Sequence, residues 1–198
     1  MEIKPIETVY KGYRFRSRLE ARWAVFFDIL HVRYVYEQDG FDLDGTYYLP
    51  DFYLNDYELY VEIKPFDKDV VGYIGDNNMW EQKCAKFRDI TGKAILICYE
   101  EPAKDLSKIL YAWDNGSGSA GPSNRKAFFS DIGDILVPPS SHEICITDYM
   151  KVNTHIRTAT EYEWNEYINS MRIPGDECIV NYAMLKARQA RFEHGEKP

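Results

Sequence analysis

Two acids and a lysine, set in two short motifs, are the residues of this chain most suited to chemistry. Asp51 follows Pro50, and Glu62 and Lys64 come eleven and thirteen residues after Asp51. If the two segments pair as neighbouring strands, both carboxylates and the ammonium group converge on one face. Two carboxylates in a partly dry site repel each other unless a cation neutralises them. Mg²⁺ suits such a set because it binds carboxylates, water and phosphate oxygens, and the lysine can orient a water or stabilise charge on a phosphate.

Alternating hydrophobic residues indicate the strands that must position this cluster. Residues 47–54 are predicted as one strand with Pro50 near its middle, and residues 58–64 as the next, after a turn at 55–56. The second strand has an apolar face and a face that carries the chemistry, namely Leu59, Val61 and Ile63 against Tyr60, Glu62 and Lys64. Together with a strand at 32–37, these segments are expected to form an antiparallel meander.

Helical spacing of apolar residues predicts two helices around the meander. The first runs from Ser17 to about Leu30 and has a core-facing stripe of Leu19, Trp23, Phe26 and Leu30. The second runs from about residue 78 to residue 91, where Gly92 ends it. A buried strand follows at 94–99, whereas residues 9–15 fit a short strand or an extended arm. The fold class is therefore α/β with a mixed central sheet.

These motifs, in this order, resemble the PD-(D/E)XK nuclease superfamily. The order helix, three strands, helix, strand matches its αβββαβ, restriction-endonuclease-like core, and the likeness covers roughly residues 10–100. The stretch 13–23 (Tyr-Arg-Phe-Arg-Ser-Arg-Leu-Glu-Ala-Arg-Trp) is similar to the opening of small phage nucleases and of transposon end-cleaving endonucleases. The tail at 187–196 is also similar to tails of the phage group.

The resemblance implies a set of roles for individual residues. Asp51 and Glu62 would bind Mg²⁺, with Mn²⁺ as a substitute, together with the Ile63 carbonyl and Glu20 on the first helix. Lys64 would complete the catalytic set. The implied activity is phosphodiester hydrolysis that leaves a 5′-phosphate.

Each site residue also has a purely structural explanation. Ser17 and Glu20 have the spacing of a capping box, in which the glutamate folds back on the start of its own helix. Asp51 could be a solvated acid at a turn or strand end. Glu62 and Lys64 could form an ordinary salt pair on a solvated strand.

Basic residues on both sides of the cluster are candidates for substrate binding. Arg14, Arg16 and Arg18 alternate with smaller or aromatic residues and could contact a phosphate backbone. Gln82 and Lys83 on the second predicted helix could also reach substrate. An ordinary basic surface, or a solvated helix face, explains both groups equally simply.

The net charge of the chain is unfavourable for binding nucleic acid, but its basic residues are concentrated at the two ends. The chain carries a formal charge of -8, which is unusual for a nucleic-acid binder. Residues 1–36, however, hold seven basic against four acidic residues, and residues 181–198 hold four against two. Two basic ends thus flank an acidic middle that a metal ion would partly neutralise.

Composition and length bound the rest of the chain. With 198 residues and 45% hydrophobic residues, the chain is long enough for one α/β domain and an appendage. We expect a nuclease core at 1–115, a flexible loop at 116–124 and an extension at 125–198, with strands near 128–129, 135–137 and 143–147 and helices at 161–171 and 181–193. Four cysteines without Cys-x-x-Cys spacing are expected to be reduced. No apolar run is long enough to span a membrane, and a cytoplasmic location is expected.

These features favour the hypothesis that the chain is a metal-dependent DNA endonuclease from a phage or a mobile element. A homodimer is consistent with duplex cutting, which needs two centres. The alternatives are a nucleic-acid- or protein-binding module with weak catalysis, and a nuclease that acts on RNA or branched DNA. Cleavage assays on each substrate would distinguish these hypotheses.

Overall fold

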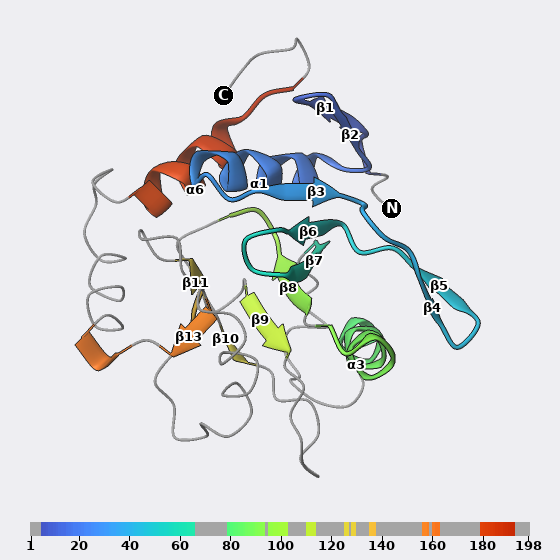
Figure 1. Ribbon diagram of the computed structural model, residues 1–198. Helices are drawn as coiled ribbons and strands as arrows, with labels where there is room; N and C mark the ends of the chain where they lie inside the picture. The colour runs from blue at the N-terminus through green and yellow to red at the C-terminus, as the bar shows by residue number, and fades with distance from the viewer. Residues whose placement is uncertain are drawn as a thin grey trace.

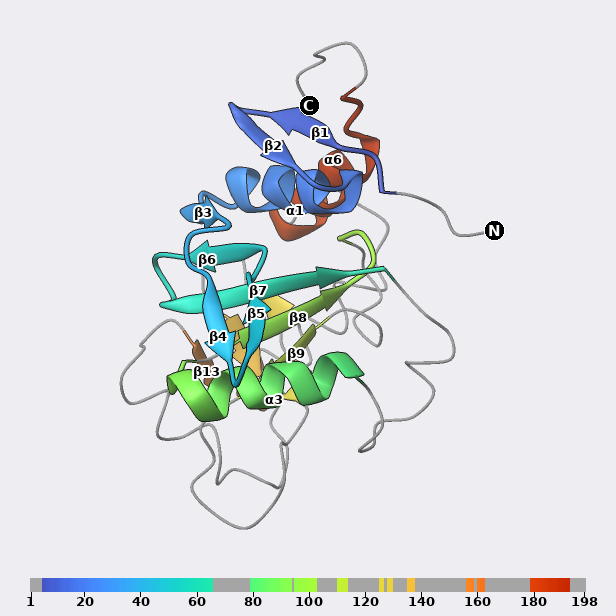
Figure 2. The same ribbon diagram turned by 90° about the vertical axis from the view of Figure 1, so that its right-hand side faces the viewer.

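The computed structural model describes residues 5–65, 79–93, 95–102, 110–113, 125–126, 128–129, 135–137, 156–158, 160–162 and 179–192. A six-stranded sheet lies in the middle of the molecule, with helices on both faces (Figure 1 and Figure 2). One face is covered by α1, against which α6 packs, and the other by α3. These helices comprise Arg18–Ile29 (α1), Met79–Thr91 (α3) and Ile179–Gln189 (α6). The expected α/β class with a mixed central sheet is confirmed.

The central sheet has the strand order β10-β9-β8-β7-β6-β3. Its strands are β3 (Tyr34–Tyr36), β6 (Phe52–Leu54), β7 (Leu59–Lys64), β8 (Ile95–Tyr99), β9 (Leu110–Trp113) and β10 (Arg125–Lys126). All neighbours are antiparallel except β7 and β8, which are parallel. A parallel pair needs a crossover connection, and α3 lies within that connection. The antiparallel meander β3-β6-β7 and the positions of α1, α3 and β8 agree with the sequence-based expectations.

The expectation of one strand over residues 47–54 is wrong. The segment is divided between β5 (Thr46–Tyr48), which pairs with β4 (Phe41–Leu43) in a separate hairpin, and β6 of the central sheet. Pro50 explains the division, because proline has no N–H to continue a hydrogen-bonded ladder. The β4–β5 hairpin is therefore inserted between the first two strands of the meander, and it extends away from the central sheet in Figure 1.

Residues 9–15 form a hairpin rather than an extended arm. Strand β1 (Thr8–Tyr10) pairs antiparallel with β2 (Tyr13–Phe15). The two residues between them, Lys11 and Gly12, have φ values of +47° and +85°. Two successive positive φ values are typical of the type I′ turns that join short twisted hairpins. The hairpin delivers the chain to the start of α1.

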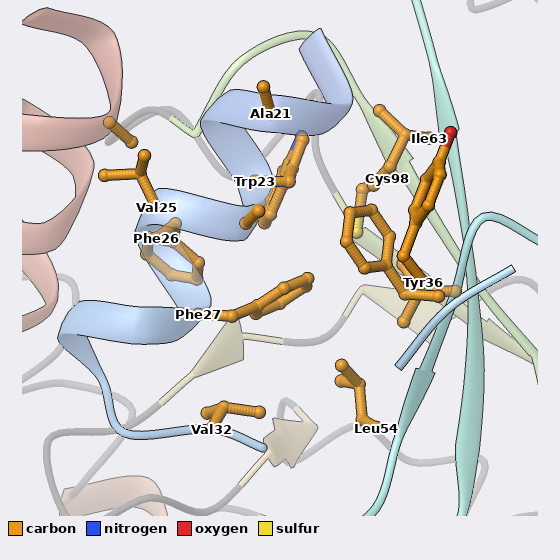
Figure 3. Close-up of a cluster of buried hydrophobic side chains, with 14 of the residues drawn as sticks. Ala21, Trp23, Val25, Phe26, Phe27, Val32, Tyr36, Leu54, Ile63 and Cys98 are labelled. Atoms are coloured by element: carbon orange, nitrogen blue, oxygen red, sulfur yellow. The ribbon is translucent and has the colours of Figure 1, made fainter. Parts of the chain in front are cut away.

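Helix α1 is buried on more than the predicted stripe. Trp23 and Phe26 are buried as expected, and Leu19 and Leu30 are partly buried against the same core. Further buried residues lie all around the helix, namely Ala21, Ala24, Val25 and Phe27. The additional burial arises because α6 packs on the side of α1 that faces away from the sheet, through small residues such as Ala183 and Ala187. Figure 3 shows Val25 beside α6, and Tyr36 and Leu54 on the sheet side of α1.

The start of α1 is fixed by Ser17. Its backbone is extended, and its Oγ accepts a hydrogen bond from the Glu20 N–H at 3.2 Å. Such N-caps satisfy a donor that the helix itself cannot. We expect Ser17→Ala to lower the free energy of unfolding by about 1 kcal/mol, which corresponds to about 2–4 °C in Tm for a chain of this size. Urea unfolding measures the change, Ser17→Thr serves as the control that keeps the hydroxyl, and an unaltered midpoint for Ser17→Ala would contradict this role.

A second core lies between the sheet and α3. Phe87 and Cys84 of α3 are buried against the sheet residues Tyr60, Ile95, Ile97 and Tyr99. The β4–β5 hairpin closes this core through Leu43 and Tyr48, and the ring centroids of Phe41 and Phe87 lie 4.9 Å apart. The two faces of β7 thus belong to different cores. Its Val61 side packs toward α1, as predicted for the apolar face, whereas its Tyr60 side packs toward α3 and was predicted only to carry the chemistry.

The later part of the chain contributes to both the sheet and the helical layers. Strand β10 pairs with β9 at one edge of the central sheet, and α6, which begins two residues before the expected helix and ends at Gln189, packs against α1. A small sheet is formed by β11 (Phe128–Phe129), β12 (Ile135–Val137) and β13 (Ile156–Thr158). The loop expected at 116–124, the strand at 143–147 and most of the helix at 161–171 lie outside the described residues. Among the residues described, none of the helices has the length and apolar character to cross a membrane.

Candidate metal centre

Three acidic side chains from different elements are buried where β6 begins and β7 ends, at the end of this strand pair away from its connecting turn. Glu20 comes from the first turn of α1, Asp51 from the residue before β6, and Glu62 from the interior of β7. Their exposed fractions are only 7%, 2% and 3% respectively. Buried carboxylates are rare unless they have partners. The contacts of each therefore decide what the cluster can do.

The register of β6 and β7 brings Asp51 and Glu62 face to face. Phe52 is paired with Val61, so continuing the antiparallel register by one residue places Asp51 opposite Glu62. Residues that oppose each other across two strands project from the same face. Lys64 projects from this face as well, two residues beyond Glu62. The predicted convergence of Asp51, Glu62 and Lys64 is thus found in the structure.

Both oxygens of Asp51 are engaged. Its Oδ2 accepts a hydrogen bond from the Ile63 N–H at 2.7 Å, and its Oδ1 accepts one from Nη2 of Arg16 at 2.8 Å. Burial, followed by the negative charges of Glu62 and Glu20, raises the pKa of Asp51 to about 8, against the opposing effects of Lys64 and the Ile63 N–H. Burial is therefore the main reason that Asp51 resists ionisation, and the neighbouring carboxylates add to it.

Glu62 is also held at both oxygens. Tyr48 at the end of β5 donates its O–H to Glu62 Oε2 at 2.9 Å, and Lys64 forms an ion pair with Glu62 Oε1. Burial, followed by the nearby Cys84 and Glu62, raises the pKa of Tyr48 well above its usual value, so the phenol remains a donor. The β4–β5 hairpin thus fixes the orientation of a candidate metal ligand.

Pro50 has a specific consequence for the main chain of β7. Continuing the register by a further residue places Pro50 opposite Ile63. The N–H and C=O of one strand residue point toward the same neighbouring strand, and the Ile63 N–H points toward Asp51. The Ile63 carbonyl therefore points toward Pro50, which has no N–H to donate to it. Proline at this position thus cannot provide a ladder hydrogen bond to the carbonyl that the family resemblance implies as a metal ligand.

Glu20 forms only half of the capping box predicted as its alternative role, because its N–H donates to Ser17 Oγ but, among the described contacts, its carboxylate accepts nothing from the Ser17 N–H. Its Oε1 accepts a hydrogen bond from Ser17 Oγ at 2.7 Å, and its Oε2 accepts one from the Tyr36 O–H at 2.5 Å. The main-chain N–H of Arg16 also donates to Oε2, at 3.1 Å. Glu20 is nonetheless close enough to Asp51 to raise the pKa of that residue. Its role as a metal ligand stays a prediction.

The basic residues proposed for substrate binding differ in their relation to the site. Arg16 lies at the cluster, where its Nε contacts Glu37 Oε1 at 2.7 Å while its Nη2 contacts Asp51. Lys83 of α3 lies with its Nζ 4.5 Å from the ring centroid of Tyr48. Arg14 is 74% exposed and forms an ion pair with Glu7 instead.

The two remaining candidates add less to this picture. Arg18 is half-buried in the first turn of α1. Gln82 belongs to α3, and its side chain lies outside the described part of the structure.

Three participants were not expected from the sequence: Tyr36, Glu37 and Tyr48. Tyr36 and Glu37 stand at the end of β3, beside Asp51, whose carbonyl accepts a hydrogen bond from the Glu37 N–H at 2.9 Å. Tyr48 stands two residues before Pro50. No local pattern distinguishes these residues from the other tyrosines and acids of the chain. The proximity of Tyr48 to the Pro50-Asp51 motif was the one available signal.

The donor set fits a divalent cation only in part. Within the described ranges, no group of three or more His, Cys, Asp or Glu side chains is arranged to hold a metal ion. The oxygens of Glu20 are turned to Ser17 and Tyr36. Asp51 and Glu62 remain as a pair of facing buried carboxylates beside the Ile63 carbonyl. Two carboxylates with additional water and phosphate oxygens are a usual environment for Mg²⁺, and this pair provides it once Arg16 and Lys64 release their oxygens.

Comparison with known proteins identifies no relative of this chain. The chain matches no protein-family model, no curated protein and no solved structure. The resemblance to PD-(D/E)XK nucleases therefore depends on the residues and geometry described above.

Proposed function

We propose that this chain is a metal-dependent nuclease that hydrolyses phosphodiester bonds of DNA, with the restriction-endonuclease-like fold and as an endonuclease of the PD-(D/E)XK type. The observation that carries the proposal is the facing pair Asp51 and Glu62, buried on adjacent strands with Lys64 on the same face. A structural salt pair would explain Glu62 and Lys64, but it gives no reason to bury a second carboxylate opposite them. Asp51 is paired with Arg16, which is itself more than half exposed, so the two buried carboxylates favour a further cation.

Each residue of the site has a separate role in the proposed reaction. Asp51, Glu62 and the Ile63 carbonyl would hold the metal ion, with assistance from Glu20. The ion would supply positive charge at the scissile phosphate. Tyr48 keeps Glu62 in place through its hydrogen bond. Lys64, beside Glu62, is placed to orient the attacking water or to stabilise negative charge that develops on the phosphate.

Positive charge at the rim of the site supports a nucleic-acid substrate. Arg16 is 55% exposed while it contacts the buried Asp51, so it links the cluster to the surface. Lys83 lies on the α3 side of the same cluster. Contacts of this kind to phosphates position a substrate without reading its sequence. If the substrate is duplex DNA, a homodimer would supply the second centre.

A second candidate function follows from the hydrogen bonds and ion pairs that already occupy the carboxylate oxygens of the cluster. Each carboxylate oxygen of Asp51, Glu62 and Glu20 already has a protein partner. A network satisfied in this way can serve a nucleic-acid- or protein-binding module in which catalysis is slow or absent. This alternative predicts binding without metal-dependent cleavage.

A cleavage panel distinguishes these functions. Single-stranded DNA, duplex DNA, branched DNA and RNA are incubated with the purified chain in Mg²⁺, in Mn²⁺ and in EDTA. We expect metal-dependent cleavage of DNA with 5′-phosphate products and none in EDTA. Cleavage of RNA alone would change the substrate class and keep the chemistry. A chain that binds these substrates but cuts none of them in either metal would be the binding module.

A further inference from the structure

The two facing carboxylates share one pattern of partners. One oxygen of each accepts from a group without charge, the Ile63 N–H for Asp51 Oδ2 and the Tyr48 O–H for Glu62 Oε2. The other oxygen of each contacts a cation, Arg16 for Asp51 Oδ1 and Lys64 for Glu62 Oε1. The oxygens on cations are those that an incoming metal ion would take over, because it can replace the charge that it displaces. Lys64 belongs to the catalytic set already, so the unexplained cation is Arg16.

Arg16 is held in a way that allows this exchange. Its guanidinium bridges two acids, with Nε at 2.7 Å from Glu37 Oε1 and Nη2 at 2.8 Å from Asp51 Oδ1. Its main-chain N–H is fixed separately by Glu20 and Tyr36. Loss of the Asp51 contact would therefore leave both the backbone and the Nε contact in place. More than half of the Arg16 side chain is exposed, so the guanidinium can turn toward solvent or a substrate phosphate.

We propose that Arg16 is a positioning residue that occupies Asp51 Oδ1 in place of a divalent cation and gives up this oxygen when the cation binds. The inference rests on the proposed function, since it takes Asp51 as a metal ligand. The guanidinium and the metal ion compete for one oxygen, so the substrate-free protein binds metal more weakly than the carboxylates alone would allow. Glu37 keeps the displaced guanidinium at the rim, where a phosphate can accept its Nη donors. Metal and substrate binding are then coupled through one side chain.

Mn²⁺ binding without nucleic acid tests the competition. Isothermal titration of Mn²⁺ into the wild-type chain and into Arg16→Gln measures the two dissociation constants directly. We expect Arg16→Gln to bind Mn²⁺ more tightly, by about 5- to 150-fold, the range of typical coupling between two ligands. Arg14→Gln is the matched control. It removes the same charge two residues away, from a side chain paired with Glu7, and we expect it to change the affinity little.

A second variant and a measurement on the wild type keep the test valid even if Arg16→Gln does not fold. Arg16→Lys keeps one positive charge but cannot bridge Glu37 and Asp51. We therefore expect its affinity for Mn²⁺ to lie between that of the wild type and that of Arg16→Gln. In the wild type, the Arg16 Nε–Hε resonance, assigned by its loss in Arg16→Gln, is expected to shift when Mg²⁺ is added. An unmoved resonance at saturating Mg²⁺ would overturn the proposal.

The titrations separate this inference from the nuclease proposal. Equal gains in Arg16→Gln and Arg14→Gln, or no gain in Arg16→Gln, would overturn the competition. The nuclease proposal would survive that result if Asp51→Asn still abolishes Mn²⁺ binding. If neither the wild type nor Arg16→Gln binds Mn²⁺, both the competition and the metal-dependent function are wrong.

Discussion

Replacing Asp51 by asparagine is expected to reduce metal-dependent cleavage by more than about a hundredfold, the order of loss seen when one stabilising group is removed from a catalytic site. The amide keeps the size of the side chain and can still accept from the Ile63 N–H. It loses the negative charge that a divalent cation requires. Loss of activity with an intact fold would therefore identify a role in metal binding rather than in packing. Initial cleavage rates in Mg²⁺, over a range of metal concentrations, measure the effect.

The control for this substitution is Asp89→Asn, which makes the same chemical change on α3. Asp89 is largely exposed and pairs only with its neighbour Arg88 among the contacts described. We expect its cleavage rate to match that of the wild type. Glu62→Gln should lose activity as Asp51→Asn does, because Glu62 is the facing carboxylate. Wild-type rates in both Asp51→Asn and Glu62→Gln would leave the facing pair without a catalytic role.

The metal-free protein is expected to lose stability as pH rises from about 4 to about 8. In the unfolded chain Asp51 titrates near its ordinary pKa of about 4, whereas burial and then Glu62 raise its pKa in the folded protein to about 8. The folded state therefore binds more protons than the unfolded state between these two values. The stabilising effect of the protonated form is complete below the lower pKa and is lost as pH rises through the upper one. We expect a fall in Tm of about 5 °C or more.

Thermal unfolding in EDTA at several pH values measures this dependence. Asp51→Asn cannot ionise at this position, so its Tm should vary less with pH, and above about pH 8 it should exceed that of the wild type. Saturating Mg²⁺ should restore part of the wild-type Tm at high pH, because a ligand that binds only the folded state stabilises it. Identical pH profiles for the wild type and Asp51→Asn would show that Asp51 is not the titrating group.

The elements that could be predicted from sequence are those whose pattern is local. Strand β7 alternates strictly between its two cores, and α1 and α3 have apolar residues at helical spacing. The segment 47–54 was mistaken for one strand because a run of aromatic and apolar residues outweighed a single proline. The all-round burial of α1 was not foreseen because it depends on α6, which lies far away in the sequence. The apolar residues outside the expected stripe, such as Ala24, Val25 and Phe27, indicate a helix that is covered on a second side, but they do not say which segment covers it.

In the site too, the residues that could be predicted are those related by a local pattern. Asp51, Glu62 and Lys64 could be placed together because a strand register relates them. Arg16 could be identified as basic, but its simultaneous contacts with Asp51 and Glu37 depend on how the β1–β2 hairpin meets β3. Tyr48 reaches Glu62 only because the β4–β5 hairpin folds over α3. Contacts made by hairpins that lie outside the main sheet are set by tertiary packing, which no short pattern encodes.

The turn between β6 and β7 constrains how this sequence can diverge. Leu54 pairs with Leu59, so four residues, 55–58, separate the paired ends, and this length fixes Asp51 opposite Glu62. Inserting one residue within either strand would reverse the direction of every side chain beyond it. The acid would then enter the aromatic core beneath α1, and an apolar side chain would take its place. Among descendants of this chain, insertions should therefore be found in the β4–β5 hairpin rather than between Asp51 and Lys64.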